Sequence, residues 1–177
     1  MFRKLVCFGV GAVLLSGPSA ADEKQPAATA VFVNPAGESI GEASLWQGPR
    51  GVLIYVGLTG LSPGKHAIHL HAAGACEPDF AASKGHINPG GAMHGLLNPE
   101  GPDSGDLPNI YASEAGTVRA ELYTTAVHVS GTFGDRAALM DDDGTALVIH
   151  AMGDDHATQP IGGAGGRVAC GVITPST

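Results

Sequence analysis

The stretch Lys65-His66-Ala67-Ile68-His69-Leu70-His71 is the segment from which the fold is most readily interpreted. Apolar residues alternate with its last two histidines, and Gly74 follows, which is typical of a short β-strand that ends in a turn. Positions i and i+2 of a strand share one face about 7 Å apart, so His69 and His71 would present both imidazoles together, with His66 on the opposite face. Two imidazoles on a rigid strand can supply half of a metal site, although such a pair alone is weak evidence.

Seven other segments share this character. They are rich in β-branched and apolar residues, show partial alternation, and are bounded by Gly or Pro. The chain holds 27 Gly and 12 Pro in 177 residues, which disfavours long helices. The sequence therefore predicts an all-β Greek-key sandwich or barrel of about eight antiparallel strands. The seven segments are 30–34, 40–47, 52–58, 118–123, 126–132, 146–150 and 168–173.

Two long segments interrupt the regular spacing of the predicted strands. Residues 74–109 are rich in Gly, Pro, Asp and His, and residues 151–166 form a second, shorter loop. Loops of this length inside a compact domain are usually functional. The first loop carries His86 and His94, and the histidine-bearing strand leads into it.

The N-terminus has the features of a secretory signal peptide. Arg3 and Lys4 precede an apolar stretch at 5–15, and small residues follow at 19–21. We therefore expect residues 1–21 to be removed and residues 22–177 to form one exported domain. No apolar run reaches the roughly 18 residues that a membrane span requires.

Cysteine content and charge narrow the class of protein further. Cys76 and Cys170 remain after the signal peptide, and an even number of cysteines in an exported protein suggests one disulfide. In the loop-entropy model, such a disulfide would stabilise the folded state by at most about 4–5 kcal/mol, because it closes a long loop in the unfolded chain. The net charge of −8 argues against a general nucleic-acid binder.

Five blocks of sequence resemble the copper/zinc superoxide dismutase family. They occur in the family's order and spacing, and the resemblance covers about residues 30–174. The blocks are Gly64 to His71 with Gly74 and Cys76, Gly85-His86-Ile87-Asn88-Pro89, Gly105-Asp106-Leu107-Pro108, Gly144 to His150, and Gly166-Arg167-Val168-Ala169-Cys170-Gly171-Val172-Ile173.

The resemblance implies a copper site and a catalytic arginine. His69, His71, His86 and His150 would bind copper, and Arg167 would lie beside the copper and attract superoxide. Four imidazoles suit copper, which heads the affinity order of the divalent metals. One-electron chemistry needs a metal that changes oxidation state, which zinc does not. The resemblance also implies that the two cysteines are paired.

A zinc site is implied next to the copper. His86 would bridge the two metals, His94 and Asp106 would bind zinc, and Asp154 would hydrogen bond to ligands of both. The family's third zinc histidine is replaced by Asp103, which can also bind zinc through oxygen. We expect a zinc site of lowered affinity or altered selectivity, with an empty site and ordinary zinc binding as the alternatives.

The function expected from the resemblance is superoxide dismutation, an antioxidant oxidoreductase reaction that alternates Cu(II) and Cu(I) and yields oxygen and hydrogen peroxide. The alternative is an exported copper-binding protein without catalysis, for storage, delivery or sensing. The partner is superoxide, with no nucleic acid and no membrane after signal removal. A homodimer is left open, and the location is the periplasm or the exterior.

The remaining histidines are expected to have other roles. His66 would pack or hydrogen bond behind the copper loop. His128 lies between two valines of a predicted strand and would face solvent, and His156 would be a solvated loop residue.

Overall fold

The computed structural model describes residues 24–131 and 133–176. The predicted signal peptide, residues 1–21, lies outside the described residues. The described part consists of eleven strands and one short 3-10 helix, which confirms the all-β prediction. The elements are β1 Ala28–Val33, β2 Ser39–Gln47, β3 Val52–Leu58, β4 Gly64–His66, β5 Ile68–His71, η1 Phe80–Ser83, β6 Ile110–Ala112, β7 Val118–Thr124, β8 Val127–His128, β9 Ala137–Ala138, β10 Ala146–His150 and β11 Arg167–Pro175.

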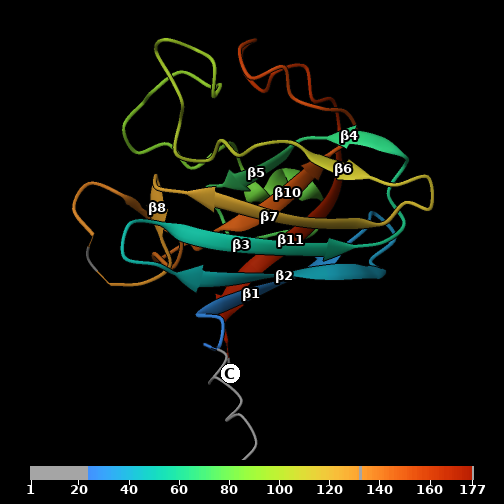
Figure 1. Ribbon diagram of the computed structural model, residues 1–177, viewed down its shortest axis with the longest axis horizontal. Helices are drawn as coiled ribbons and strands as arrows, with labels where there is room; N and C mark the ends of the chain where they lie inside the picture. The colour runs from blue at the N-terminus through green and yellow to red at the C-terminus, as the bar shows by residue number, and fades with distance from the viewer. Residues whose placement is uncertain (1–23, 132, 177) are drawn as a thin grey trace, which may run out of the picture.

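Seven strands form one antiparallel sheet that curls around the core, in the order β5-β10-β11-β1-β2-β3-β7 (Figure 1). The hairpins β1-β2-β3 join strands that are consecutive in sequence. Strands β10 and β11 are also consecutive and are joined by the second long loop. The remaining neighbours come from distant parts of the chain, and the connections that cross between them give the Greek-key character. The described residues also contain the small antiparallel pair β4-β6 and the parallel pair β8-β9.

The core lies inside the curl of the sheet. Alternate side chains of β1, β2 and β3 point into it, as the period-two pattern predicts. Burial of these side chains is the main stabilising term of the fold. The largest fully buried apolar side chains are Phe32, Leu45, Ile54, Leu58, Ile68, Leu70, Leu107, Ile110, Leu139, Leu147 and Ile149.

Within the seven-stranded sheet, β5 and β10 differ from the other strands because both of their faces are buried along their whole length. Ile68 and Leu70 belong to the core, whereas His69 and His71 occupy the alternate positions. These alternate positions need a second cover, which the first long loop provides. The histidine-bearing face of the sheet is therefore a polar interior separate from the apolar core.

Two strand predictions need correction. The predicted strand 65–71 is two strands separated at Ala67, whose amide donates to the carbonyl of Met152 at 2.8 Å and whose carbonyl accepts from the amide of His150 at 2.9 Å. The chain therefore leaves one sheet and enters another within one residue. The predicted strand 126–132 is reduced to the two residues of β8, and residue 132 lies outside the described part. The short strands β6 and β9 were not predicted.

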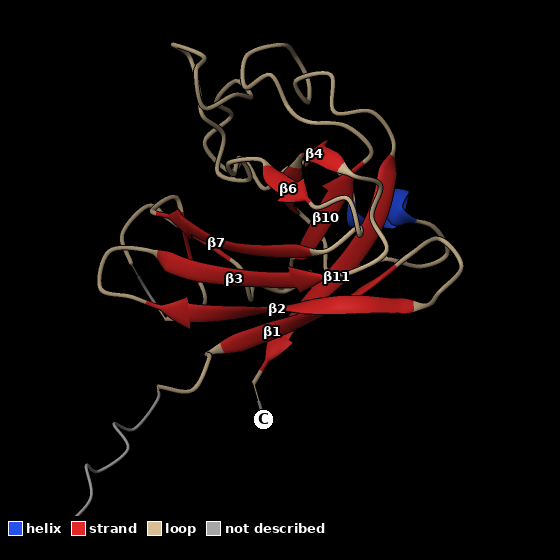
Figure 2. Cartoon of the chain, turned by 45° about the vertical axis from the view of Figure 1, so that its right-hand side comes forward, coloured by secondary structure: helices blue, strands red, loops and turns tan. Residues whose placement is uncertain are grey.

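Both predicted long loops are present and lie on the same side of the molecule, above β5 and β10 (Figures 1 and 2). The amide of Leu97 in the first loop donates to the carbonyl of His156 in the second at 2.9 Å. Together the loops cover the polar face of the sheet. Among the described residues, no helix has the length and apolar character needed to span a bilayer.

Candidate metal centre

The first long loop lies along the free edge of β5. The amide of Leu70 donates to the carbonyl of Gly105, and the amide of Ile87 donates to the carbonyl of Leu70, each at 2.9 Å. A Cβ at Gly105 would lie 2.3 Å from the Leu70 carbonyl oxygen, so the approach requires glycine. This pairing brings His86 opposite His71 on the strand.

Four histidines converge near this edge, and each donates a hydrogen bond from one ring nitrogen to an acceptor on the protein. His69 donates through Nε2 to Asp154 Oδ2 at 2.9 Å, and His86 donates through Nδ1 to Asp103 Oδ2 at 2.9 Å. The other two donate to backbone carbonyls. The Nδ1 atom of His71 donates to the carbonyl of Lys84 at 2.8 Å, and that of His150 donates to the carbonyl of Gly165 at 3.0 Å.

The second ring nitrogen of each of these histidines is buried and has no hydrogen-bond partner. These atoms are Nδ1 of His69 and Nε2 of His71, His86 and His150. Ligand atoms of the first three residues lie within 4.8 Å of one another. The His150 ring centroid lies 5.1 Å from that of His69 and 5.8 Å from that of His71. A nitrogen lone pair is costly to bury unless something binds it, so this donor set fits a soft-to-borderline cation such as copper.

Burial also sets the charge of these rings. It lowers the pKa of His71 to about 2 and the pKa of His150 to about 4, and it lowers the pKa of His69 despite the hydrogen bond with Asp154. The three rings are therefore neutral at physiological pH. A neutral imidazole that donates through one nitrogen presents a lone pair on the other, as a metal ligand must.

A second cluster shares His86 with the first. Its ligand atoms lie within 4.8 Å of one another and come from His86, His94, Asp103 and Asp106. His94 Nδ1 donates to Asp106 Oδ1 at 2.5 Å. Burial disfavours the charged form of His86, but the hydrogen bond to Asp103 and the nearby negative carboxylate of Asp106 outweigh it and raise the pKa to about 9. Two imidazoles and two carboxylates suit a divalent cation such as zinc.

Asp154 connects the two clusters. Its Oδ2 accepts from His69 and its Oδ1 accepts from His94 Nε2 at 3.2 Å. Burial opposes ionisation of Asp154, but these contacts and the amide of His156 lower its pKa below the ordinary range. A Cβ at Gly162 would lie 1.6 Å from Asp154 Oδ1, so this carboxylate position also requires glycine in the second loop.

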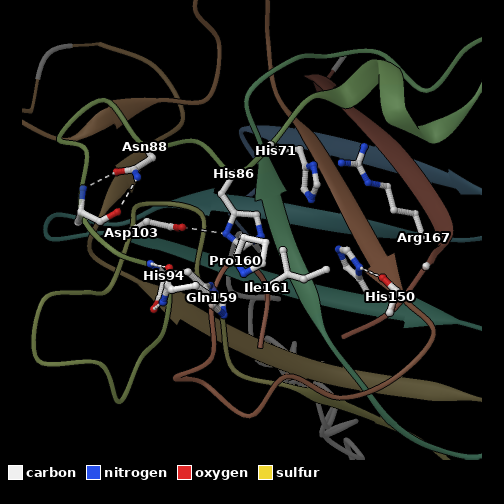
Figure 3. A pocket seen from close by; sticks show the side chains of 14 residues that line it. His71, His86, Asn88, His94, Asp103, His150, Gln159, Pro160, Ile161 and Arg167 are labelled. Atoms are coloured by element: carbon white, nitrogen blue, oxygen red, sulfur yellow. Dashed lines mark hydrogen bonds and ion pairs between the residues drawn. The ribbon is translucent and has the colours of Figure 1, made fainter. Parts of the chain in front are cut away.

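A cavity of about 560 Å³ opens beside both clusters, and Arg167 lines it together with His71, His86 and His150 (Figure 3). Arg167 is the residue of β11 that pairs with His150 of β10. Its Nη1 bonds to the carbonyl of Phe80 and to Ser83 Oγ at 3.0 Å, and its Nη2 bonds to the carbonyl of Lys84 at 2.6 Å. The short helix η1 therefore fixes the guanidinium at the cavity wall.

The predicted disulfide is confirmed. Cys76 of the first loop is bonded to Cys170 of β11, with a Cα–Cα distance of 5.8 Å. Cys170 packs with Ala146 and Val148 of β10, and Phe80 lies against this small cluster. The bond thus attaches the loop that bears η1 to the strand that bears Arg167.

Comparison with known proteins agrees with this geometry. The family model of copper/zinc superoxide dismutase (SODC) matches residues 39–173. The chain belongs to the copper/zinc superoxide dismutase family. A relative from Caulobacter vibrioides, named superoxide dismutase [Cu-Zn], is 50% identical over 148 residues, which are 82% of this chain and 84% of the relative. Superoxide dismutase [Cu-Zn] 2 from Aquifex aeolicus is 43% identical over 173 residues, 97% of this chain and 99% of the relative.

Solved structures support the dismutase fold. A SOD-like protein from Bacillus subtilis superposes with a TM-score of 0.75 at 32% identity, covering 81% of this chain and 95% of that one. The Cu/Zn superoxide dismutase from Brucella abortus superposes with a TM-score of 0.66 at 29% identity, covering 82% and 98%. The family uses copper and zinc, and the two histidine-rich clusters provide donors for both.

The structure of this dismutase-family chain brings together every residue that the sequence singled out for the two sites. What sequence reasoning missed are the backbone acceptors, namely the carbonyls of Phe80, Lys84 and Gly165, because no residue type marks them. It also missed the cavity wall formed by Pro160 and Ile161 of the second loop (Figure 3).

The other three histidines have different outcomes. His66 is buried, and its ring nitrogens lie 2.7 Å from the carbonyl of His150 and 2.8 Å from the carbonyl of Ser62, in agreement with a supporting role. The solvent-facing prediction for His128 is wrong, because only 5% of that residue is exposed. Its ring centroid lies 5.4 Å from that of Phe133, a residue of the segment between β8 and β9, whose packing the alternation did not indicate. His156 is half-buried and accepts a hydrogen bond from Asn109 at 2.8 Å.

Proposed function

We propose that this chain is an exported, copper-dependent superoxide dismutase. The observation that carries the proposal is the set of four buried imidazoles, each with one unpartnered nitrogen, beside an arginine that lines an open cavity. Family membership supplies the reaction, and the chain keeps the donors and the cation that the reaction needs.

In this proposal His69, His71, His86 and His150 hold copper. When bound, copper supplies a centre that accepts and returns one electron, so that one superoxide is oxidised to oxygen and another is reduced to hydrogen peroxide. The protein's contribution is to keep the imidazoles of His69, His71 and His150 neutral and to fix the orientation of all four through hydrogen bonds. Their fixed hydrogen bonds mean that little has to reorganise when the charge of the site changes.

Arg167 binds and orients the substrate. Its guanidinium keeps its charge and is held in place by acceptors on and next to η1. Superoxide is a small anion, so a fixed cation at the cavity wall beside the His150 ring favours its approach to the imidazole cluster. Reduction to peroxide needs two protons, and His86 is placed to carry one of them at Nε2 when that atom is otherwise free.

The second cluster holds zinc in this proposal. His86, His94, Asp103 and Asp106 are its ligands, and Asp154 fixes the imidazoles of both sites from behind. With two carboxylates in place of one, the site is harder and more anionic than a set of three histidines and one aspartate. We therefore infer weaker zinc binding or altered selectivity.

Residues 1–21 are the export signal in this proposal, and residues 22–177 are the mature single domain. The disulfide supports the assignment, because such bonds persist in oxidising compartments outside the cytoplasm. Expression of the full chain in a bacterial host tests it. The periplasmic product should begin at Ala21 or Asp22 by mass, whereas an intact cytoplasmic product would contradict export.

The test of catalysis is the number of superoxide molecules consumed per copper. A non-catalytic copper protein can react about once per metal ion, whereas an enzyme consumes a large excess without loss of rate. We expect the copper-loaded mature protein to consume a thousandfold excess of superoxide. Consumption that stops near one equivalent per copper would favour the non-catalytic alternative, which nothing in the family comparison supports.

A further inference from the structure

We propose that Asp103 is a positioning residue that holds His86 in its copper-binding orientation when the second site contains no zinc. The inference rests on the proposed copper site. It concerns a position at which this chain departs from the family pattern of three histidines and one aspartate. Its consequence is a copper site whose geometry does not depend on occupation of the neighbouring site.

The Asp103 carboxylate is buried and held at several points. Its Oδ1 accepts from the amide of Gly105 at 2.8 Å, and its Oδ2 accepts from His86 Nδ1 at 2.9 Å. Its own amide donates to Asp106 Oδ2 at 3.0 Å. Gly105 is the residue whose carbonyl pairs with β5, so the carboxylate is fixed relative to the strand that carries the first two histidines.

Donation from Nδ1 leaves Nε2 of His86 as the atom available to a metal. That atom is buried and unpartnered, and the ligand atoms of His69, His71 and His86 already lie within 4.8 Å of one another. A carboxylate that accepts from the far nitrogen of a metal-binding imidazole fixes both its tautomer and its orientation. Asp103 makes this contact with His86 without help from a second cation (Figure 3).

Asp106 does not serve this purpose for His86. Its Oδ1 lies 3.5 Å from His86 Nδ1 and already accepts from His94 at 2.5 Å. Its Oδ2 accepts from the amides of Gly95 and Asp103, at 2.7 and 3.0 Å. Asp103 is therefore the acceptor available to His86 among the carboxylates of the second cluster.

The experiment is a copper(II) titration of the zinc-free mature protein against a competing chelator, with pulsed electron paramagnetic resonance to count the bound imidazoles. Three proteins are compared with the unmodified chain. Asp103→Ala removes the acceptor, and Asp103→Asn keeps the volume and one acceptor oxygen. Asp142→Ala removes the same charge from an exposed position and serves as the control.

The unmodified chain and Asp142→Ala should bind one copper with four imidazoles. Asp103→Ala should bind copper at least tenfold more weakly, with three imidazoles. Asp103→Asn should lose affinity to a smaller degree and regain the fourth imidazole in part, and it gives the result if the alanine variant does not fold.

Four bound imidazoles and unchanged affinity in a folded Asp103→Ala or Asp103→Asn protein would overturn the inference and leave the proposed function standing. Failure of the unmodified chain to bind copper at all would instead overturn the proposed function. The spectroscopic count separates a positioning role from general destabilisation, because a merely less stable protein would keep all four imidazoles on the copper it binds.

Discussion

Arg167 carries the permanent positive charge among the described residues that line the cavity. The whole chain has a net charge of −8, which would repel superoxide at long range. Attraction then depends on the local field at the cavity and not on total charge. The guanidinium is held by backbone carbonyls and one hydroxyl, so its position does not depend on pairing with an acidic side chain.

Replacement of Arg167 by alanine should slow dismutation about tenfold or more at low ionic strength, because the local attraction of the anion is lost. The rate of the unmodified enzyme should fall as salt is added, and the variant should show a flatter salt dependence. Arg119→Ala, on β7 and bonded to Tyr55, is the matched control and should leave the rate unchanged. Equal salt dependence in the two variants would refute the steering role.

In the proposed zinc site, Asp103 stands where the family resemblance implies a third histidine. Replacing it with histidine would give the usual three imidazoles and one carboxylate, and zinc should then bind more tightly. Dialysis against a graded chelator measures this directly, with zinc content as the readout. Zinc retained equally well by Asp103→His and by the unmodified protein would show that the aspartate does not weaken the site.

For single residues, the sequence predicted the side chains of the two sites and one of their partners, Asp154, but not their backbone partners. The histidines could be recognised from spacing and family resemblance, because they are chemically distinctive. The carbonyls of Lys84 and Gly165 that fix two of them could not, since backbone acceptors are defined only by the path of the folded loop.

Among the structural elements, the first long loop forms one wall of the candidate metal centre, and the free edge of β5 holds this loop in place through backbone hydrogen bonds. The disulfide attaches this loop to β11 near the site where η1 holds Arg167. Loss of the disulfide should therefore lower the free energy of unfolding and loosen the position of the Arg167 guanidinium. The loop is otherwise secured by a limited number of backbone hydrogen bonds to the strand.

Replacement of Cys76 and Cys170 by alanine should lower the free energy of unfolding by about 2–5 kcal/mol. Urea denaturation of the metal-free protein measures this, and the unmodified protein in reductant should behave like the double variant. Dismutation should also lose part of its salt dependence, because the Phe80 carbonyl would be free to move away from Arg167. An unchanged unfolding midpoint would contradict a structural role for the bond.

The sequence predicted the long strands of the sheet well, because their alternation and flanking glycines are strong signals. It missed the division of 65–71 at Ala67, which depends on hydrogen bonds to the distant residues Met152 and His150. Three-residue strands such as β6 show too little periodicity to be recognised. The predicted loops, in contrast, followed correctly from composition and length.

In the whole molecule, the end of the sheet formed by β5 and β10 has an apolar face and a face that carries histidines. One face of β5 and β10 packs into the apolar core, and the other carries buried neutral imidazoles. Without metal this arrangement makes stability depend on pH. The histidines with lowered pKa change the stability of the protein at acid pH, and the histidine with raised pKa changes it at alkaline pH.

Metal-free protein should be most stable near pH 6.5. The pKa values of His71 and His150 fall to about 2 and about 4, so below pH 6.5 the unfolded chain binds protons that the folded chain does not. Each then reduces stability by up to about 1.4 kcal/mol per pH unit as the pH falls. His86, with a pKa of about 9, stabilises fully below pH 6.5 and loses this contribution as the pH rises to 9.

Urea unfolding of the metal-free protein from pH 4 to 9 checks this expectation. His71→Gln removes one of the acid-sensitive groups and should flatten the loss of stability between pH 6.5 and 4. A stability that rises steadily towards acid pH would contradict the protonation states assigned to the cluster.

The most direct test of a copper-dependent dismutase is the superoxide dismutation rate per copper of the mature protein loaded with copper alone. We predict a rate in the range of diffusion-limited enzymes, among which superoxide dismutases are counted. The rate should be abolished in His69→Ala, which removes a ligand fixed by Asp154. A rate no faster than that of the His69→Ala protein, with copper bound stoichiometrically and with no gain on adding zinc, would contradict the assignment.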